Sequence, residues 1–350
     1  MEKHQHDRSA ERPPAACRVY LCTYRRPDTL KRAVDSLLAQ TFTDWVCELH
    51  NDAPDDSYPR ELVEEIGDPR ITVVDHPRNL GPTRTFNLVF SEVRESFVTL
   101  LEDDNWWEPS FLSRMISEME RHPEVELAWS NMRMWQEKGG AWHDLQRTIW
   151  NVDQDAEPLL FSFPHPRQIA GALHSNGAML VRPRAIARHQ IPCCTTFAAV
   201  EPVRERSFAS PLMLVPAVLA NFAITESTAQ SRHESDWWHI QVLLTASFLR
   251  HVPLTRAAIA RLWSEARRAS TRNTNSLALT GIVFPHCRHI LRFATLVDIF
   301  FLGRSLLRHP AEAARLLRLF SGRRELWDYL DCHTAARIAE ARAAGFTVFQ

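Results

Sequence analysis

The stretch LLEDDNWWEP, residues 100–109, joins an apolar run to three consecutive acids and two tryptophans. Residues 97–101, FVTLL, form a short continuous apolar segment that predicts a buried strand. Glu102, Asp103 and Asp104 follow this segment without an intervening turn residue. Adjacent carboxylates repel one another, so three consecutive acids at the end of a strand need a structural or functional explanation.

The flanking sequence alternates predicted strands with predicted helices. Such alternation predicts an α/β fold with a mostly parallel sheet flanked by helices, in which ligands bind beyond the C-terminal ends of the strands. The polar segments after the strands are therefore the candidate site. The strands are predicted at 18–23, 45–50, 70–75, 97–102 and 126–135, and the helices at 27–40, 83–93 and 109–120.

The pattern changes in the second part of the chain. Residues 135–168 predict a loop rich in Trp, Asp and Pro, and residues 207–225 predict a helix running into a short strand. Beyond residue 235 only helices are predicted, with breaks near 281–285 and 309–310. The predicted domains are a disordered tail (1–16), an α/β domain (17–235, with halves 17–134 and 135–235) and a helical C-terminal region (236–350).

Composition limits the class of protein. The 350 residues are 45% hydrophobic and 24% charged with a net charge of -1, so nothing in the overall field calls for a nucleic-acid partner. Seven cysteines without a CxxC pair suit reduced thiols. The N-terminus lacks the apolar core of a signal peptide, and no stretch reaches the ~20 apolar residues of a membrane span. These features predict a cytoplasmic protein.

The helical third is rich in arginine. Residues 236–324 contain 14 Arg against four acids, whereas the whole chain has only three Lys. This excess of Arg has two alternative explanations. One is a general preference for Arg over Lys, and the other is a surface that meets anionic lipid or an anionic acceptor. Three roles stay open for this region: an acceptor site, a homodimer interface and contact with a membrane surface.

The acids at residues 102–104 have two explanations from residue type alone. Carboxylates are preferred ligands of Mg²⁺ and Mn²⁺, and Mg²⁺ commonly binds one or two carboxylates together with substrate phosphates. The alternative is a solvated acidic turn, whose charge favours the N-terminus of the following helix. The adjacent Trp106 and Trp107 either stack on a sugar or pack into the core, and we expect one of them in the core.

Three segments in order strengthen the first explanation. Residues 19–56, 73–90 and 98–120 resemble the nucleotide-sugar-binding half of family 2 glycosyltransferases, which have the GT-A fold. The likeness continues more loosely through SNGAMLVRPRAI, residues 175–186, to about residue 235. It implies a metal-dependent enzyme, with Mn²⁺ or Mg²⁺, that moves one sugar from a nucleoside-diphosphate sugar to an acceptor hydroxyl or amine with inversion. UDP or dTDP is the expected nucleotide.

The resemblance assigns the donor site position by position. Asp104 would ligate the metal, and Asp103 would hold the ribose or sugar. A metal in that position neutralises the charge that grows on the departing diphosphate. The remaining donor-binding positions implied are Thr23, Tyr24, Asp52 and Arg84.

The second half departs from the family pattern. Glu205-Arg206 stands where Glu-Asp is expected, so Glu205 is the predicted general base and Glu201 the second choice. STAQSRHES, residues 227–235, resembles a loop that closes over the diphosphate, with Arg232 on the phosphates and His233 as a further metal ligand. His174, Ser175 and Asn176 are the predicted acceptor contacts.

Two other functions are weighed against this one. A sugar nucleotidyltransferase would need a Gly-rich loop near the first strand, and CTYRRPD has no Gly. A nucleotide-binding protein without catalysis would explain the missing Glu-Asp pair. The QxxRW motif of processive synthases is absent, which favours transfer of a single sugar.

Overall fold

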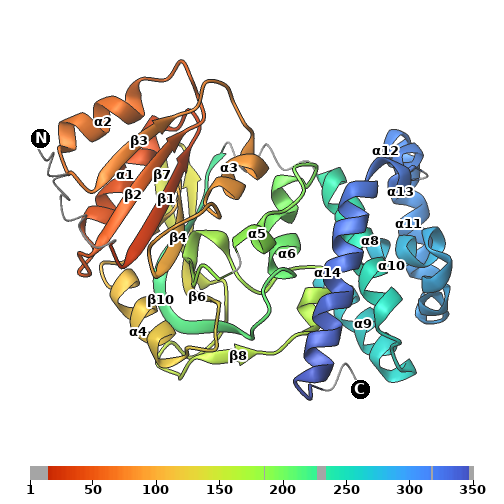
Figure 1. Ribbon diagram of the computed structural model, residues 1–350. Coiled ribbons are helices and arrows are strands. Elements are labelled where there is room, and N and C mark those ends of the chain that lie inside the picture. Colours follow the sequence, from red (N-terminus) through yellow and green to blue (C-terminus); the bar gives the residue numbers. More distant parts are fainter. Residues whose placement is uncertain (1–14, 185, 227–233, 317, 347–350) are drawn as a thin grey trace, which may run out of the picture.

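The computed structural model describes residues 15–346 except 185, 227–233 and 317. A ten-stranded sheet runs through the first two thirds of the chain, in the order β3-β2-β1-β4-β9-β6-β10-β5 (Figure 1). Its first four strands pair in parallel. They are β1 (Cys17–Thr23), β2 (Trp45–Asn51), β3 (Ile71–Asp75) and β4 (Phe97–Glu102).

The second half of the sheet is mixed. The short β9 (Met179–Val181) lies antiparallel between β4 and β6 (Leu127–Lys138), and β10 (Leu212–Ile224) runs parallel to β6. The two-residue β5 (Trp106–Trp107) pairs with β10. Two further strands extend this half, β7 (Ala141–Thr148) on β6 and β8 (Leu159–Phe161) on β10.

Both faces of the central strands β1 and β4 are buried, which explains their mainly apolar sequences. Alternate β1 residues enter different cores: Val19 and Leu21 lie in the core on the side of α1 (Pro27–Leu38), whereas Tyr20 and Cys22 lie in the core on the side of α3 (Pro82–Leu88). The second core continues through the sheet into the C-terminal helices. Helices α2 (Tyr58–Ile66) and α4 (Phe111–Arg121) complete the α1 side.

The C-terminal region is helical. Its long α8 (Glu234–His251) packs against α10 and α14, and the whole group lies at the opposite end of the molecule from β1–β3 (Figure 1). The other members are α9 (Arg256–Ala269), α10 (Thr271–Val283), η4 (Pro285–Phe293), α11 (Leu296–Arg308), α12 (Pro310–Leu316), α13 (Leu319–Gly322) and α14 (Arg324–Ala343). None of the helices in the described parts of the chain combines the length and the apolar character that crossing a bilayer requires.

A buried arginine joins these helices to the segment that precedes β10. Arg206 is 1% exposed and donates to the carbonyl oxygens of Leu244 (2.8 Å) and Ile169 (3.2 Å). It follows α6 (Val200–Glu205), one of five short helices between β8 and β10. The others are η1 (Pro166–Ile169), η2 (Asn176–Ala178), α5 (Ile186–His189) and η3 (Phe197–Ala199).

The predicted α/β class with a helical C-terminal region is confirmed. Two segments differ from the prediction. Residues 135–168 contain β7 and β8 rather than a loop alone, and residues 207–225 contain the thirteen-residue β10 rather than a helix and a short strand. Since β10 is buried along most of its length, its apolar run lacks the alternation that separates a strand from a helix.

Candidate active site

The acids of residues 102–104 lie beside the loop that follows β1. Strands β1 and β4 are parallel neighbours with Cys22 opposite Glu102, so their C-terminal ends meet at one edge of the sheet. The backbone N–H of Tyr24 donates to Asp103 Oδ2 at 3.3 Å. Asp103 is only 8% exposed, so this carboxylate is held inside the protein rather than solvated. The solvated-turn alternative therefore does not describe it.

Two arginines from the β1 side approach Asp104. Arg26 forms an ion pair with its carboxylate, and Arg32 Nη2 donates to its carbonyl oxygen at 2.8 Å. Neither arginine is among the site residues predicted from the sequence. Their position in the sequence could have indicated this role, because both residues follow β1 and the ends of neighbouring parallel strands share one edge.

The arginines at this edge do not fully offset the effect of burial on the carboxylates. Burial, with a further contribution from the Asp104 charge, raises the pKa of Asp103 to about 7. Burial also raises the pKa of Asp104, although Arg26 opposes the shift. Among the residues that the structure describes, no three His, Cys, Asp or Glu side chains are grouped as metal ligands. Two carboxylates nevertheless fit Mg²⁺ or Mn²⁺ when substrate phosphates complete the shell.

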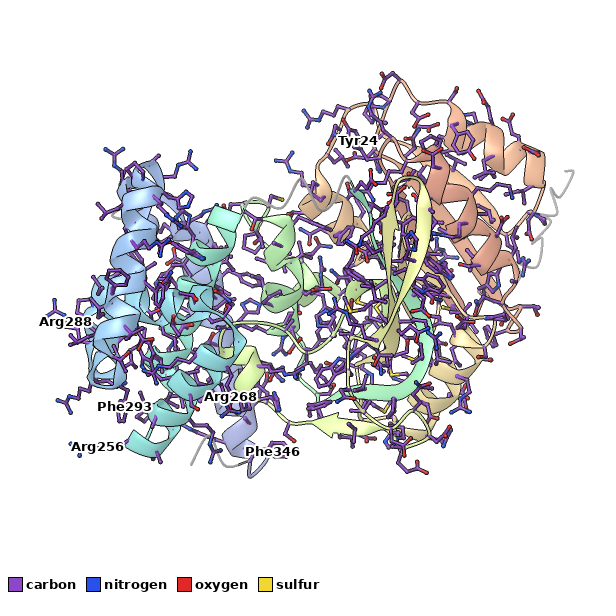
Figure 2. The ribbon with its side chains drawn as sticks, turned by 180° about the vertical axis from the view of Figure 1, so that it is seen from behind. Tyr24, Arg256, Arg268, Arg288, Phe293 and Phe346 are labelled. Carbon is purple, nitrogen blue, oxygen red and sulfur yellow. The ribbon has the colours of Figure 1, made fainter. Side chains whose placement is uncertain are left out.

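The other predicted donor residues surround the same edge. Asp52 N donates to the Thr23 carbonyl at 3.0 Å, and the Asp52 carboxylate accepts from the backbone N–H of Leu80 (2.7 Å) and Gly81 (3.1 Å). Asp52 thereby anchors the turn that begins α3, where Gly81 has a φ of 78°. Tyr24 is 47% exposed and projects from the loop after β1 (Figure 2), and Arg84 is exposed on α3.

Glu205 lies in a buried network. It is 2% exposed, and Oε2 accepts from the Leu173 backbone N–H and contacts His174 Nδ1, both at 2.8 Å. Its other oxygen accepts from Gln168. Both oxygens are therefore occupied by the segment 168–174, which leads to the predicted acceptor residues. The role of Glu205 as a base stays a prediction.

Glu201 lies one helical turn before Glu205 and faces the strand-end acids. It is half-buried, and Oε1 accepts from the Asn176 backbone N–H at 2.9 Å. Burial raises the pKa of Glu201, and its charge contributes to the raised pKa of Glu102. The structure thus brings together residues from β4, η2 and α6.

The predicted acceptor segment connects the two glutamates. His174 is oriented by Glu205, whereas the Asn176 backbone binds Glu201, and Ser175 between them is half-buried. His174 Nε2 and Asn176 Oδ1 are buried without a hydrogen-bond partner in the described part of the chain. Two orphaned polar atoms beside a partly open carboxylate indicate a place for a polar ligand or water.

The two tryptophans after the acids have different environments. Trp107 is 2% exposed, and its ring centroid lies 4.2 Å from that of Phe111, on which it stacks. Its Nε1 donates to the Gly177 carbonyl at 2.8 Å. The expected core position for one tryptophan of the pair is therefore confirmed. Trp106 is half-buried, and the Arg32 guanidinium lies 3.9 Å from its ring centroid and 4.1 Å from that of Trp142. The β6–β7 hairpin thus covers one side of the strand-end loop.

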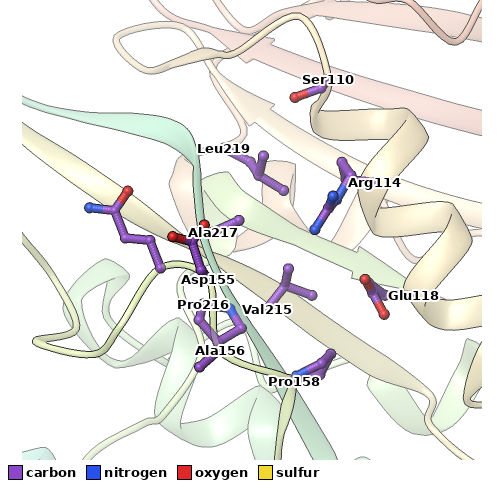
Figure 3. A pocket seen from close by; sticks show the side chains of 11 residues that line it. Ser110, Arg114, Glu118, Asp155, Ala156, Pro158, Val215, Pro216, Ala217 and Leu219 are labelled. Atoms are coloured by element: carbon purple, nitrogen blue, oxygen red, sulfur yellow. The ribbon is translucent and has the colours of Figure 1, made fainter.

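Arg232 and His233 lie outside the described residues, so their predicted contacts with diphosphate and metal stay predictions. A cleft of about 400 Å³ elsewhere lies between α4 and β10 (Figure 3). Its walls include Arg114, Glu118 and Asp155, and none of the predicted site residues contributes to it. This cleft is therefore separate from the predicted site at the strand ends.

Comparison with known proteins gives a family match over the first part of the chain. Residues 18–174 match the model of glycosyl transferase family 2. The matched segment spans less than half of the chain, and over it the chain is similar to glycosyl transferase family 2. The segment contains β1 to β4, the strand-end acids and His174, whereas α6 with both glutamates lies beyond it.

The curated relatives match only part of this chain, and the match covers only part of each relative. An uncharacterized protein of Mycobacterium tuberculosis is 27% identical over 145 residues, which are 39% of this chain and 41% of that protein. The succinoglycan biosynthesis protein ExoO of Rhizobium meliloti is 32% identical over 109 residues, 30% of this chain and 31% of its own. The chain thus matches less than half the length of these curated relatives.

Solved structures show the same fold over a longer span. S. aureus TarS 1–349 in complex with UDP-GlcNAc has a TM-score of 0.54 at 12% identity, covering 94% of this chain and 92% of that one. The complex of TarS 1–349 with UDP has a TM-score of 0.51 at 14% identity. The predicted GT-A architecture of this chain is confirmed at the level of the fold.

Proposed function

We propose that the protein transfers a single sugar from a nucleoside-diphosphate sugar, with UDP or dTDP as the nucleotide, to an acceptor hydroxyl or amine with inversion. The observation that carries this proposal is the meeting of the buried Asp103–Asp104 pair with the loop after β1, at the C-terminal edge of parallel strands. Its support is the family 2 match and the shared fold with TarS, which was solved with UDP-GlcNAc.

Asp104, with Asp103 beside it, would hold a divalent Mn²⁺ or Mg²⁺ ion together with the diphosphate. A bound cation would supply neutralisation of the negative charge on the leaving diphosphate. Arg26 already pairs with Asp104 and lies at the same edge, so it can add positive charge toward the phosphates. The loop with Arg232 and His233 is proposed to complete the phosphate contacts.

For the general base, the geometry favours Glu201 over Glu205. A base needs an oxygen that reaches the acceptor, and Glu205 has both oxygens occupied in a buried network. Glu201 is half-buried, uses one oxygen on the Asn176 backbone and lies near Glu102. We assign Glu205 the role of positioning His174, and assign His174, Ser175 and Asn176 to the acceptor side.

Donor binding is tested by calorimetry with UDP, dTDP and GDP, with and without Mn²⁺. One nucleotide should bind in a metal-dependent way, and Asp104→Asn should remove the metal dependence. The matched control is Asp328→Asn, which changes an exposed carboxylate on α14. Failure of the folded native protein to bind any of the three nucleotides would overturn the donor proposal.

The base assignment is tested with Glu201→Gln and Glu205→Gln under conditions of saturating donor. Loss of a general base costs about 10²- to 10⁴-fold in kcat, so Glu201→Gln should lower kcat by this amount with an unchanged unfolding temperature. Glu205→Gln should lower the unfolding temperature as well as activity, because it disturbs the buried network. An unchanged kcat for Glu201→Gln would contradict its role. The cytoplasmic location stays a prediction from the sequence.

A further inference from the structure

Helix α11 presents large apolar side chains to solvent instead of to the core. Leu296 is 90% exposed, Phe300 64% and Leu307 83%. These positions fall on one stripe of the helix, whereas the side that packs inward buries Asp298 and Leu302. Three further apolar side chains of the helix are exposed, Val297, Ile299 and Phe301. An apolar face of this extent marks an interaction surface.

The surroundings of α11 are positively charged. Residues 266–311 contain seven Arg and a single acid, Asp298. Arg304 and Arg308 lie on α11 itself, one and two turns after Phe300, and both are exposed. Neither arginine has an acidic partner within the part of the chain that the structure describes, so their charge is directed to solvent or to a ligand.

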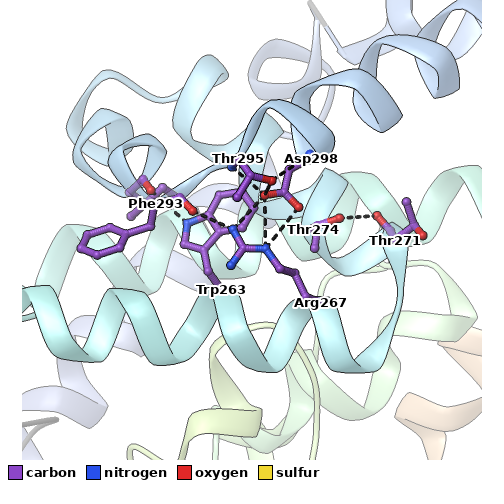
Figure 4. Close-up of polar contacts among 8 residues, drawn as sticks. Trp263, Arg267, Thr271, Thr274, Phe293, Thr295 and Asp298 are labelled. Carbon is purple, nitrogen blue, oxygen red and sulfur yellow. Dashed lines mark hydrogen bonds and ion pairs between the residues drawn. The ribbon is translucent and has the colours of Figure 1, made fainter.

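The single acid is already used inside the protein. Asp298 accepts from the Thr295 backbone N–H at 2.7 Å in a capping box, and Arg267 Nη2 pairs with it at 2.8 Å (Figure 4). Trp263 supports the same region by donating from Nε1 to the Ile290 carbonyl at 2.9 Å. These contacts fix the start of α11, so its apolar face is held in place rather than free to fold inward.

A cleft of about 520 Å³ adjoins this region between α9 and η4. It is lined by Arg256, Arg292, Phe293, Ala257 and Ala260. Arg256 and Arg292 are exposed, and among the described residues neither has an acidic partner. Two unpaired guanidinium groups beside an apolar wall suit a phosphate group that is attached to an apolar body.

We propose that the outward face of α11, with the arginines of α9 and η4, docks on an anionic lipid bilayer. Leu296, Phe300 and Leu307 would enter the boundary between headgroups and acyl chains, and the arginines would contact lipid phosphates. A second copy of the chain fits less well, because a two-fold interface pairs this arginine-rich face with itself, and the face offers no unpaired acid in the described residues from Thr295 to Arg308.

The docking face leaves the donor site accessible. Arg256, Arg288 and Phe293 lie at the opposite end of the molecule from Tyr24 (Figure 2). A bilayer that contacts α11 therefore does not cover the loop after β1. The proposal goes beyond the transfer reaction and does not depend on it.

The test is flotation of the full-length protein with vesicles of phosphatidylcholine alone and of phosphatidylcholine mixed with phosphatidylglycerol. The native protein should bind only the anionic vesicles, and binding should weaken as salt shortens the screening length. Phe300→Glu and Leu307→Glu should each weaken binding about tenfold or more, since each removes an apolar side chain that would enter the bilayer. Arg304→Gln should weaken it about fivefold.

The matched control is Leu160→Glu, which changes a side chain that is 47% exposed on β8 and should leave binding unchanged. Since all the substituted side chains are exposed, the unfolding temperatures should stay at the native value. Equal binding by the native protein and the Phe300→Glu/Leu307→Glu double variant would overturn the proposal. Absence of vesicle binding, with a dimer in sedimentation that Phe300→Glu dissociates, would overturn it in favour of a second copy.

Discussion

Replacement of Gly177 by alanine tests how the acceptor segment packs against the end of β4. An ideal Cβ at this position would lie 2.6 Å from Glu102 Oε2 and 2.7 Å from Asn105 Nδ2. These two atoms are hydrogen-bonded to each other at 2.7 Å, and Asn105 Oδ1 also accepts from the Ala223 backbone N–H at 2.9 Å. The added methyl group must therefore displace a buried polar pair rather than a flexible side-chain end.

The expected cost follows from these contacts. Overpacking of a filled site costs about 1–3 kcal/mol, and loss of a buried hydrogen bond adds about 1 kcal/mol. The lower entropy of alanine in the unfolded chain returns about 0.4–1 kcal/mol, because Gly177 is not in the left-handed region. Gly177→Ala should thus lower the free energy of unfolding by about 1–3.5 kcal/mol.

Urea unfolding measures this loss, and calorimetry of nucleotide binding measures its effect on the site. Since Asp103 and Asp104 lie directly between Glu102 and Asn105, donor affinity should fall together with stability. The matched control is Gly303→Ala in α11, where a Cβ meets nothing within 4 Å. That change should stabilise the protein by up to about 1 kcal/mol through helix propensity. A native or higher stability for Gly177→Ala would refute the packing described here.

Three further predictions concern stability. Burial lowers the pKa of His189 from 6.5 to about 4, with Arg204 and Arg188 adding to the shift, so the folded state holds this ring neutral. The unfolded chain binds the proton more readily, so stability on the order of 3 kcal/mol should be present above pH 6.5 and lost as the pH falls toward 4. Unfolding measured at several pH values should show a smaller slope in His189→Gln. Arg206→Leu leaves several buried carbonyl and hydroxyl oxygens unpaired at about 1–3 kcal/mol each, so its urea midpoint should fall strongly with an unchanged fold class by circular dichroism. Asp298→Ala removes the side-chain acceptor that completes the α11 capping box and the Arg267 ion pair, and should cost about 1–2 kcal/mol in thermal unfolding.

A specific measurement would contradict each of these three stability predictions. A native slope for His189→Gln would show that another group controls stability between pH 4 and 6.5. A native midpoint for Arg206→Leu would mean that the C-terminal helices do not depend on this arginine. A native melting temperature for Asp298→Ala would show that the α11 cap adds nothing to stability.

The strand-end acids illustrate what could be predicted from sequence. The apolar run before Glu102 and the position of Asp103 and Asp104 at its end are local features, so they predicted both β4 and the edge where the site lies. The family 2 resemblance then supplied the function. The partners of these acids could not be predicted, because Arg26 and Arg32 reach Asp104 through pairing of β1 with β4 across more than 70 residues.

Glu205 and Glu201 show the limit of sequence spacing. They lie four residues apart on α6, and spacing alone favoured Glu205. Whether a carboxylate is open or enclosed depends on what packs over it, and segment 168–174 encloses Glu205 while Glu201 stays partly open.

By itself, the sequence determined the order of the elements, the mostly parallel sheet and the acids at its edge, since these depend on local periodicity and on residues that follow one another. Only the tertiary structure decided that Arg26 neutralises Asp104, that Glu205 is enclosed and that the apolar side of α11 faces outward. An amphipathic pattern predicts a helix but not the direction its apolar face takes, because that direction depends on which neighbouring surfaces are already covered.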